Sequence, residues 1–494
     1  MRAGMLSIVI VFAGSGFLCR AEEPSSPATD EPPKLPKGVE ILARGPVHEA
    51  FAAPGGEPLP TQAVPKRPPK PLDEVPPADK PEGKVVWIGG YWSWDDERKD
   101  FLWVSGLWRT PPPHKQWIPG YWRERGEQWQ WVVGFWTDAV GEDKSTKDVA
   151  YLPKPPVMPN VAPMGAAPAD DCFYVPGAWT WSPAARSYAW RAGYWARMQP
   201  GYVWVADRYL WTPNGYIFVP GYWDLAVNRR GLLYAPVYVQ PQVAAVGLTY
   251  MPYYVVGDAF LLETLFVRPA FCHYYFGDYY GPAYARMGYE SIFLHGGRRY
   301  DSIVVYETWA HRAQPNWVSA QINIVNYRNR GAMALPPRTL VQQTTLVQKN
   351  ASVLMPASEL MAAKGMRTTP MNTSMRAAAQ GQAASIQQAA TQRIAAEKPS
   401  AAPAAPGQAR VASLAVTKAR GEPAGFASQR GSAFGTAPTS HGPYPSFVPG
   451  GYQPATPYAR PGQPQRGAPG YRQVRPSESP SHRPPPRDSR QHRG

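Results

Sequence analysis

The chain has 494 residues and a formal net charge of +15, and its 59 prolines and 44 glycines are unevenly spread. Stretches this rich in proline and glycine rarely pack a core, which argues against two or three ordinary domains in sequence. Of the 19 tryptophans, 17 lie between Trp87 and Trp223, so we expect one compact aromatic region flanked by disordered segments.

Residues 1–21 have the pattern of a secretory signal peptide. Arg2 supplies the positive charge, residues 5–18 are apolar, and Cys19 and Ala21 are small residues at the −3 and −1 positions of a cleavage site. The apolar stretch is shorter than the roughly 20 residues that span a bilayer. A lipid anchor on Cys19 is the less favoured alternative, because the residue before it is large. We therefore predict an exported protein of the periplasm, cell envelope or extracellular space, with no transmembrane segment after cleavage.

Residues 22–83 contain 16 prolines and predict an extended, disordered linker without a core. Such a linker is either a spacer that holds the following region away from an anchoring surface or an inert leader.

A repeated pattern, aromatic-x-x-Gly-x-Trp, begins at Trp87. Its seven copies have these aromatic, glycine and tryptophan positions: 87/90/92, 103/106/108, 117/120/122, 131/134/136, 174/177/179, 190/193/195 and 218/221/223. A shift of 87 residues maps the first four copies onto the later ones and places an eighth, decayed copy around Asp207. The chain thus contains a tandem duplication of a four-repeat module, at residues 84–137 and 172–223, with a linker at 138–171.

The repeats are rich in aromatic and β-branched residues and are separated by turn-like stretches, which predicts strands. A period near 14 residues fits one strand of about nine residues and a turn of about five, so each module is predicted to be a four-stranded antiparallel sheet. Trp103 and Trp108 are five residues apart and would face opposite sides of a regular strand. A bulge at Gly106 with positive φ would bring them to one face.

Three further segments follow the modules. Residues 224–340 form a mixed, Tyr-rich extension with one or two helices, predicted at 258–266 and 301–312. Residues 341–399 are rich in Ala and Gln and partly helical, around 375–396. Residues 400–494 are a disordered basic tail that carries most of the net charge. The fold class is therefore mainly β, with disordered termini.

The repeats, together with the stretches 211–223 and 229–237, resemble the WxxGxW/YxWGxW-repeat exported proteins of planctomycetes. The similarity covers roughly half of the chain. It implies export and a bacterial envelope setting, and it implies no chemistry, because no activity is attached to that family.

The tryptophans of the repeats have two interpretations. Aligned on an open sheet they form a flat platform on which sugar rings stack, and interlocked across strands they form a core, which is the simpler interpretation. The candidate platform residues are Trp87, Trp92, Trp103, Trp108, Trp117, Trp122, Trp131, Trp136, Trp179, Trp190, Trp195 and Trp223.

Other candidate sites give weaker signals. Cys172 and Cys272 can form one disulfide or remain two free thiols. His273, His295 and His311 match no metal-binding spacing, and no common catalytic motif is present, so we expect no enzyme activity and no cofactor.

The leading functional hypothesis is a structural or interaction protein of the cell envelope. The alternative is a carbohydrate-binding module that uses the tryptophan face. The partners considered are envelope glycans, anionic polymers and other envelope proteins, and no nucleic acid is expected.

Overall fold

The computed structural model describes residues 34–141, 143–159, 163, 165–297, 299–346, 353–398 and 409–416. All of them lie within residues 1–424. The predicted signal peptide and most of the predicted basic tail, residues 417–494, lie outside the described residues. Among the helices that the structure describes, none is long and apolar enough to cross a membrane.

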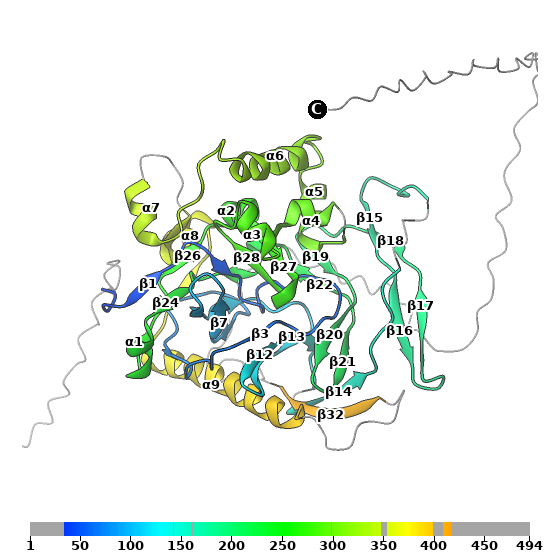
Figure 1. The fold of residues 1–494 in the computed structure, drawn as a ribbon, viewed down its shortest axis with the longest axis horizontal. Coiled ribbons are helices and arrows are strands. Elements are labelled where there is room, and N and C mark those ends of the chain that lie inside the picture. The colour runs from blue at the N-terminus through cyan, green and yellow to red at the C-terminus, as the bar shows by residue number, and fades with distance from the viewer. Residues whose placement is uncertain are drawn as a thin grey trace, which may run out of the picture. The chain divides into compact units, whose positions relative to one another are not determined.

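Each two consecutive repeats fold into one four-stranded unit (Figure 1). The strands of unit I are β6 (Val86–Ile88), β7 (Tyr91–Asp95), β8 (Asp100–Val104) and β9 (Leu107–Arg109), and those of unit II are β10 (Lys115–Ile118), β11 (Tyr121–Arg125), β12 (Gln128–Val132) and β13 (Phe135–Asp138). The strands of unit III are β15 (Cys172–Val175), β16 (Ala178–Ser182), β17 (Ser187–Arg191) and β18 (Tyr194–Arg197), and those of unit IV are β19 (Tyr202–Val205), β20 (Arg208–Thr212), β21 (Gly215–Val219) and β22 (Tyr222–Leu225). Units I and II form the first unit pair, and units III and IV form the second.

Within every unit the outer two strands pair with each other and so do the inner two, always antiparallel. Thus β6 pairs with β9 and β7 with β8. The other units repeat this arrangement. The prediction that each module is a single four-stranded antiparallel sheet is therefore wrong, because each module contains eight short strands in two units. The mainly β fold is confirmed.

The glycines separate two strands rather than forming a bulge in one. At Gly106 the chain leaves the ladder of β8 with β7 and enters the ladder of β9 with β6, so Trp103 and Trp108 belong to different ladders. Gly106 is not among the residues with positive φ, so the bulge prediction is wrong. The glycine is required for space: the Cβ of an alanine there would lie 2.7 Å from Cζ2 of Trp87 and 2.8 Å from the carbonyl oxygen of Ile88.

The 87-residue shift between the modules is confirmed by the strand register. Trp87 faces Trp108 in unit I, and Tyr174 faces Trp195 in unit III. Likewise Trp117 faces Trp136 in unit II, and the equivalent pair in unit IV is Trp204 with Trp223.

The described part of the N-terminal segment, residues 34–83, is not the extended linker that its prolines predict. Val47, Ala50 and Phe51 are buried in the core. Proline lacks an N–H group but is tolerated at the edges and ends of strands, and between the prolines this segment forms short strands. They are β1 (Val39–Ile41), β2 (Gly45–Pro46), β3 (Ala63–Val64), β4 (Asp73–Glu74) and β5 (Asp79–Pro81).

The extension at 224–340 contains more helices than the one or two predicted. The two predicted helices are present as α2 (Asp258–Glu263) and α5 (Ser302–Ala310), and α5 begins where the buried Asp301 side chain accepts hydrogen bonds from two backbone N–H groups. The other elements are η1 (Val227–Arg229), β23 (Gly231–Leu232), β24 (Val237–Val239), α1 (Pro241–Ala245), β25 (Thr249–Tyr250), β26 (Tyr254–Val256), β27 (Leu265–Arg268), η2 (Pro269–Phe271), β28 (His273–Phe276), α3 (Pro282–Arg286), β29 (Glu290–Ser291), α4 (Ile292–Gly296) and α6 (Trp317–Asn329).

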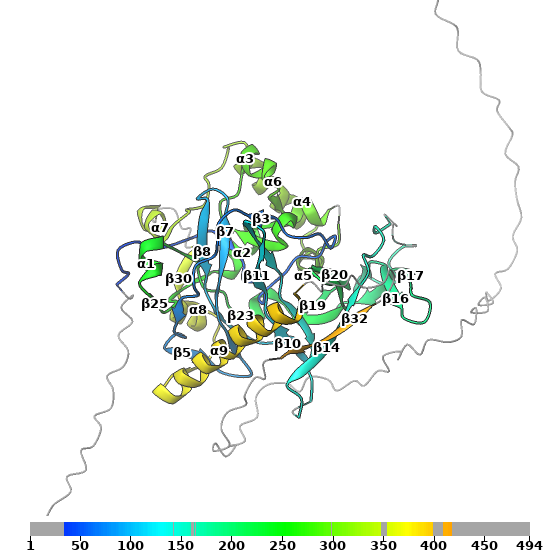
Figure 2. The ribbon, with the colours of Figure 1, turned by 60° about the horizontal axis from the view of Figure 1, so that its bottom comes forward.

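The C-terminal segments complete the body. The elements are α7 (Leu340–Leu346), β30 (Leu354–Pro356), α8 (Ala357–Ala363), β31 (Thr368–Pro370), α9 (Thr373–Ala396) and β32 (Arg410–Ala415). The helix α9 confirms the predicted helix around 375–396. It contacts β6, β10 and β11 and so covers the first unit pair (Figure 2).

Two segments predicted to lack structure contribute strands to one sheet. Residues 138–171, predicted as a linker, contain β14 (Thr146–Leu152), and β14 pairs with β21 of unit IV and with β32. Leu414 of β32 is buried. The prediction of a disordered tail from residue 400 is therefore wrong for residues 409–416. In this segment apolar and polar residues alternate, and the strand that they form pairs with the edge of β14.

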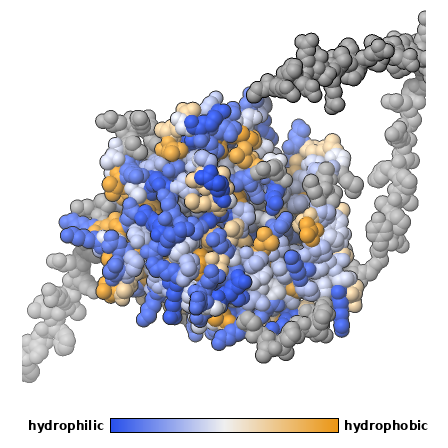
Figure 3. Space-filling model, in the orientation of Figure 1, coloured by the Kyte–Doolittle hydropathy of each residue, from blue (hydrophilic) through white to orange (hydrophobic). Residues whose placement is uncertain are grey.

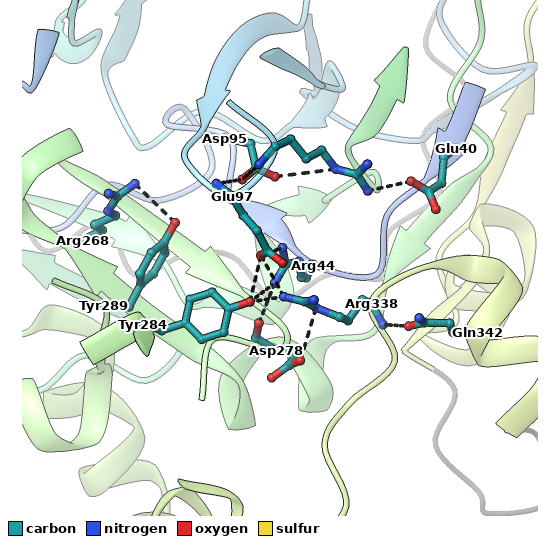
Figure 4. Close-up of polar contacts among 11 residues, drawn as sticks. Glu40, Arg44, Asp95, Glu97, Arg268, Asp278, Tyr284, Tyr289, Arg338 and Gln342 are labelled. Carbon is teal, nitrogen blue, oxygen red and sulfur yellow. Dashed lines mark hydrogen bonds and ion pairs between the residues drawn. The ribbon is translucent and has the colours of Figure 1, made fainter. Parts of the chain in front are cut away.

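Ion pairs and hydrogen bonds tie the units to the extension. Glu97, in the turn between β7 and β8, accepts hydrogen bonds from Arg44, Arg338 and Tyr284 (Figure 4). Burial alone would raise the pKa of Glu97, but the hydrogen bonds from Arg44 and Tyr284 and the two arginine charges outweigh it and lower the pKa to about 2. Glu97 therefore stays charged and holds the turn in place.

A buried ion cluster joins unit I to unit IV. Arg109 of β9 donates two hydrogen bonds to the carboxylate of Asp224 of β22, at 2.6 and 2.7 Å. Arg230 lies 3.2 Å from the same carboxylate. Both charges of such a pair must be present, since a lone buried charge is strongly destabilising.

The face of the molecule in Figure 3 is mainly hydrophilic, with apolar residues in small scattered groups.

Candidate functional site

The aromatic residues of the units meet as cross-strand pairs with nearly the same geometry. Ring centroids are 5.2 Å apart in the pairs Trp87–Trp108 and Trp92–Trp103, and 5.1 Å apart in Trp179–Trp190, all edge-to-face. This geometry is the favoured one for aromatic rings and adds stability beyond simple burial. The tryptophans are therefore interlocked within each unit and do not form an open flat row.

The twelve candidate platform residues differ in exposure between the two unit pairs. Seven are buried, all in units I and II: Trp87, Trp92, Trp103, Trp108, Trp117, Trp131 and Trp136. Five are half-buried: Trp122 in unit II, Trp179, Trp190 and Trp195 in unit III, and Trp223 in unit IV. Any ligand that contacts these residues must therefore do so mainly on the second unit pair.

A carboxylate binds the two glycines of unit I. Glu74 of β4 accepts hydrogen bonds from the backbone N–H groups of Gly90 and Gly106, each at 2.8 Å, and from the indole N–H of Trp103 at 2.9 Å. Burial raises the pKa of Glu74 to about 7, although the three hydrogen bonds oppose this rise. The two glycines and Trp103 thus direct three N–H donors at one buried carboxyl group.

Unit II holds a second carboxylate in the same place. Glu49 accepts from the N–H of Gly134 at 3.0 Å and from the indole N–H of Trp131 at 3.1 Å. Trp131 occupies the position in unit II that Trp103 has in unit I. Burial raises the pKa of Glu49, and the nearby His273 and the hydrogen bonds oppose this rise.

Unit IV supplies its carboxylate from within the repeat. Asp207 stands where the other repeats have glycine, and its side chain accepts a hydrogen bond from the N–H of Gly221 and pairs with Arg191. The aspartate in this decayed copy therefore takes the role that Glu74 and Glu49 have in the first unit pair.

A cavity of about 430 Å³ lies between units II and IV, the N-terminal segment and the extension. This volume is in the range of small-molecule sites. Its wall combines aromatic and charged side chains, among them Glu49, Arg208, Trp211, Cys272, Glu290 and His295. Glu290 and His295 are joined by a hydrogen bond of 3.0 Å. The cavity can hold a polar ligand the size of a sugar ring, with Trp211 as the apolar contact.

The two cysteines are free thiols, so the disulfide alternative is not formed. Cys172 donates a hydrogen bond to Asp171 at 3.7 Å. Cys272 lies at the cavity wall, and burial raises the pKa of its thiol to about 11, with Arg208 opposing the rise. At neutral pH the Cys272 thiol is protonated and is a poor nucleophile.

The three histidines near the Tyr-rich segment face different partners. His273 contacts the hydroxyl of Tyr91, His295 contacts Glu290, and His311 stacks on Trp317. In the part of the chain that the structure describes, no group of three His, Cys, Asp or Glu side chains is placed to hold a metal ion.

Sequence reasoning missed Glu49 and Glu74 because both lie in the segment assigned to a linker. One signal was present: each glutamate sits beside apolar residues, as in Val47–Phe51 and Leu72–Val75, where a solvated linker would carry mainly polar ones.

Comparison with known protein families identifies the same four units. The family model described as the WXXGXW repeat, in two copies, matches residues 85–109, 117–137, 173–196 and 200–224. These ranges coincide with units I to IV. No curated protein and no solved structure matches the chain.

Proposed function

We propose that this chain, which carries WXXGXW repeats, is an exported structural or interaction protein of the cell envelope and has no catalytic activity. The observation that carries the proposal is the interlocking of the repeat tryptophans. Cross-strand aromatic pairs, carboxylate-bound glycines and the buried Arg109–Asp224 pair use the repeat residues to build a rigid body.

Export rests on the residues at the start of the chain. Residues 1–21 combine a basic start, an apolar stretch and small residues at a cleavage site. The test is expression of the full chain with a C-terminal tag in a bacterium with two membranes, followed by cell fractionation. We expect the mature protein to begin at Glu22 and to sediment with the envelope or leave the cell, and a variant without residues 2–21 to stay in the cytoplasm. Uncleaved full-length protein in the cytoplasm would refute the proposal.

Carbohydrate binding is the second candidate, and the cavity is the observation that favours it. Trp211 and Tyr209 provide aromatic surface, and Arg208, Glu290 and His295 provide polar groups around it. Sugar recognition needs both kinds of contact. A glycan array probed with the mature full chain and with Trp211→Ala tests this candidate: a glycan that binds the first and not the second would support it.

A further inference from the structure

One buried arginine of the described residues has no carboxylate partner. Six arginines are more than nine-tenths buried, and five of them form ion pairs: Arg44 with Glu97, Arg109 and Arg230 with Asp224, Arg268 with Asp96, and Arg393 with Glu397. The sixth is Arg208 of β20, which is 8% exposed and forms no ion pair with a described residue. A buried charge without a counter-charge is costly, so Arg208 is the exception that calls for an explanation.

Only one end of the Arg208 guanidinium is hydrogen-bonded within the described residues. Its Nη1 donates to the carbonyl oxygens of Ala53 and Pro54, at 3.2 and 3.4 Å. Its Nε is buried without a hydrogen-bond partner, and its Nη2 donates to no described residue. The N–H groups on Nε and Nη2 lie side by side, and an edge of this kind can donate to both oxygens of one carboxylate.

Arg208 belongs to the wall of the cavity of about 430 Å³. The wall is mainly apolar, and the cavity is partly open to solvent. Tyr209 and Trp211, from the same strand as Arg208, add aromatic surface to it, and Arg299 adds a second guanidinium. Sites for small ligands combine an apolar wall with a few polar groups in this way.

The carboxylates of the same wall do not neutralise Arg208. Glu49 accepts its hydrogen bonds from unit II, and Glu290 is bonded to His295. Glu57 is on the exposed loop that follows Pro54, and it forms no ion pair with Arg208. A ligand carboxylate can therefore supply the counter-charge without displacing a carboxylate of the described chain.

We propose that this cavity binds a sugar acid, a ligand of monosaccharide size with one carboxylate, and that Arg208 binds the carboxylate. The apolar face of the sugar ring would lie against Trp211. Its hydroxyl groups would meet the polar pair of Glu290 and His295. The inference narrows the carbohydrate-binding candidate to an acidic ligand and rests on that candidate, whereas the structural role does not depend on it.

The experiment measures binding to the mature full chain by isothermal titration calorimetry. The probe is D-glucuronate, and its control is D-glucose, which has the same ring but no carboxylate. We expect glucose to bind at least about tenfold more weakly, because hydrogen bonds to a charged group are stronger than those to a neutral one. Benzoate, a carboxylate on a flat ring without hydroxyl groups, should also bind more weakly than glucuronate.

Arginine variants locate the binding site. Arg208→Gln removes the charge and should weaken glucuronate binding about tenfold or more, while glucose binding stays the same. Arg208→Lys keeps the charge but lacks the paired donors, so its affinity for glucuronate should lie between the two. Arg286→Gln is the matched control, because Arg286 is an exposed residue of α3 outside the cavity wall and its loss changes the net charge equally. Near-ultraviolet circular dichroism checks that each variant is folded, and the three ligands test the unchanged chain even if Arg208→Gln is not.

Three outcomes would overturn the proposal: equal affinity for glucuronate and glucose, undiminished glucuronate binding by folded Arg208→Gln, or benzoate binding as tight as that of glucuronate. Glucose binding without a preference for glucuronate would refute the acidic ligand and leave the carbohydrate candidate standing. Binding of neither sugar would refute the sugar-acid site, and a neutral glycan found on the array would still support the carbohydrate candidate.

Discussion

Units I and III have the same strand register, the same glycine positions and the same edge-to-face aromatic pairs, yet their surroundings differ. Unit I lies against β23, β24 and α9, and Trp87 and Trp103 are fully buried. In unit III all four tryptophans are half-buried, and the unit carries three arginines. One repeat pattern therefore serves as core in one place and as surface in another.

The difference shows which features belong to the repeat and which depend on context. Cross-strand aromatic pairs and the glycines that make room for them occur in both units, so they form the unit itself. The carboxylate on the glycine pair differs, because Glu74 comes from a segment that packs on unit I. Burial and the bound carboxylate are thus supplied by the rest of the chain.

The strongest test of this comparison is to remove the equivalent tryptophan from each unit. Trp103→Ala should lower the free energy of unfolding by about 4 kcal/mol, since it leaves a large cavity in the core. Trp190→Ala, at the matched position, should cost about 2 kcal/mol, because its ring is only half-buried. Urea unfolding followed by circular dichroism gives both values. Equal losses would mean that unit III is covered as fully as unit I.

The second test uses the pKa of Glu74, about 7 in the folded chain against an ordinary value of 4.5. Between these pH values the folded chain keeps a proton that the unfolded chain has released. Stability should therefore be full below about pH 4.5 and fall by about 3 kcal/mol as the pH rises to about 7. Glu74→Gln should remove this dependence, and Glu359→Gln, an exposed residue of α8, should leave it unchanged. Urea unfolding at pH 5 and pH 8 measures it, and identical pH profiles for all three chains would show that Glu74 is not the titrating group.

The sequence predicted the repeats, their spacing and the 87-residue duplication, because these features are local and periodic. It did not predict that each repeat splits into two strands, since a five-residue spacing of tryptophans fits either a bulge or a change of ladder. The strand register, which places Trp103 and Trp108 in different ladders, and the φ of Gly106 decide between the two.

The candidate carboxylates could not be predicted from local patterns. Glu74 and Glu49 bind glycines 16 to 85 residues further along the chain. The strand β32 pairs with β14, about 260 residues earlier in the chain. Its six residues alternate only weakly between apolar and polar side chains, which is too little to predict a strand within a long polar segment. Contacts at such separations depend on the whole fold.

The third test concerns the carboxylate that unit IV supplies itself. Asp207→Gly restores the repeat glycine but removes the acceptor for the Gly221 N–H and the partner of Arg191, so it should cost about 2 kcal/mol. Asp207→Asn keeps one acceptor oxygen and should cost about half as much. Thermal unfolding compares the two variants. An unchanged midpoint for Asp207→Gly would mean that the glycine pair of unit IV needs no bound carboxylate, and the parallel with unit I would fail.

The smallest expected effect concerns α9, which covers the first unit pair and does not cover unit III. Gly381 lies in the interior of α9, and a Cβ added there meets no atom within 4 Å. Gly381→Ala should therefore stabilise the chain by about 1 kcal/mol, because alanine loses less backbone entropy than glycine in a helix. The reverse change at Ala383, which packs near Gly89 of unit I, should destabilise by at least as much. Hydrogen exchange gives the regional result: the amides of β6 should exchange more slowly in Gly381→Ala and faster in Ala383→Gly, while those of β16 stay the same. If the amides of β16 changed their exchange rates in the same way as those of β6, α9 would stabilise both unit pairs. Units I and III would then differ in exposure but not in the stabilisation that they receive from α9.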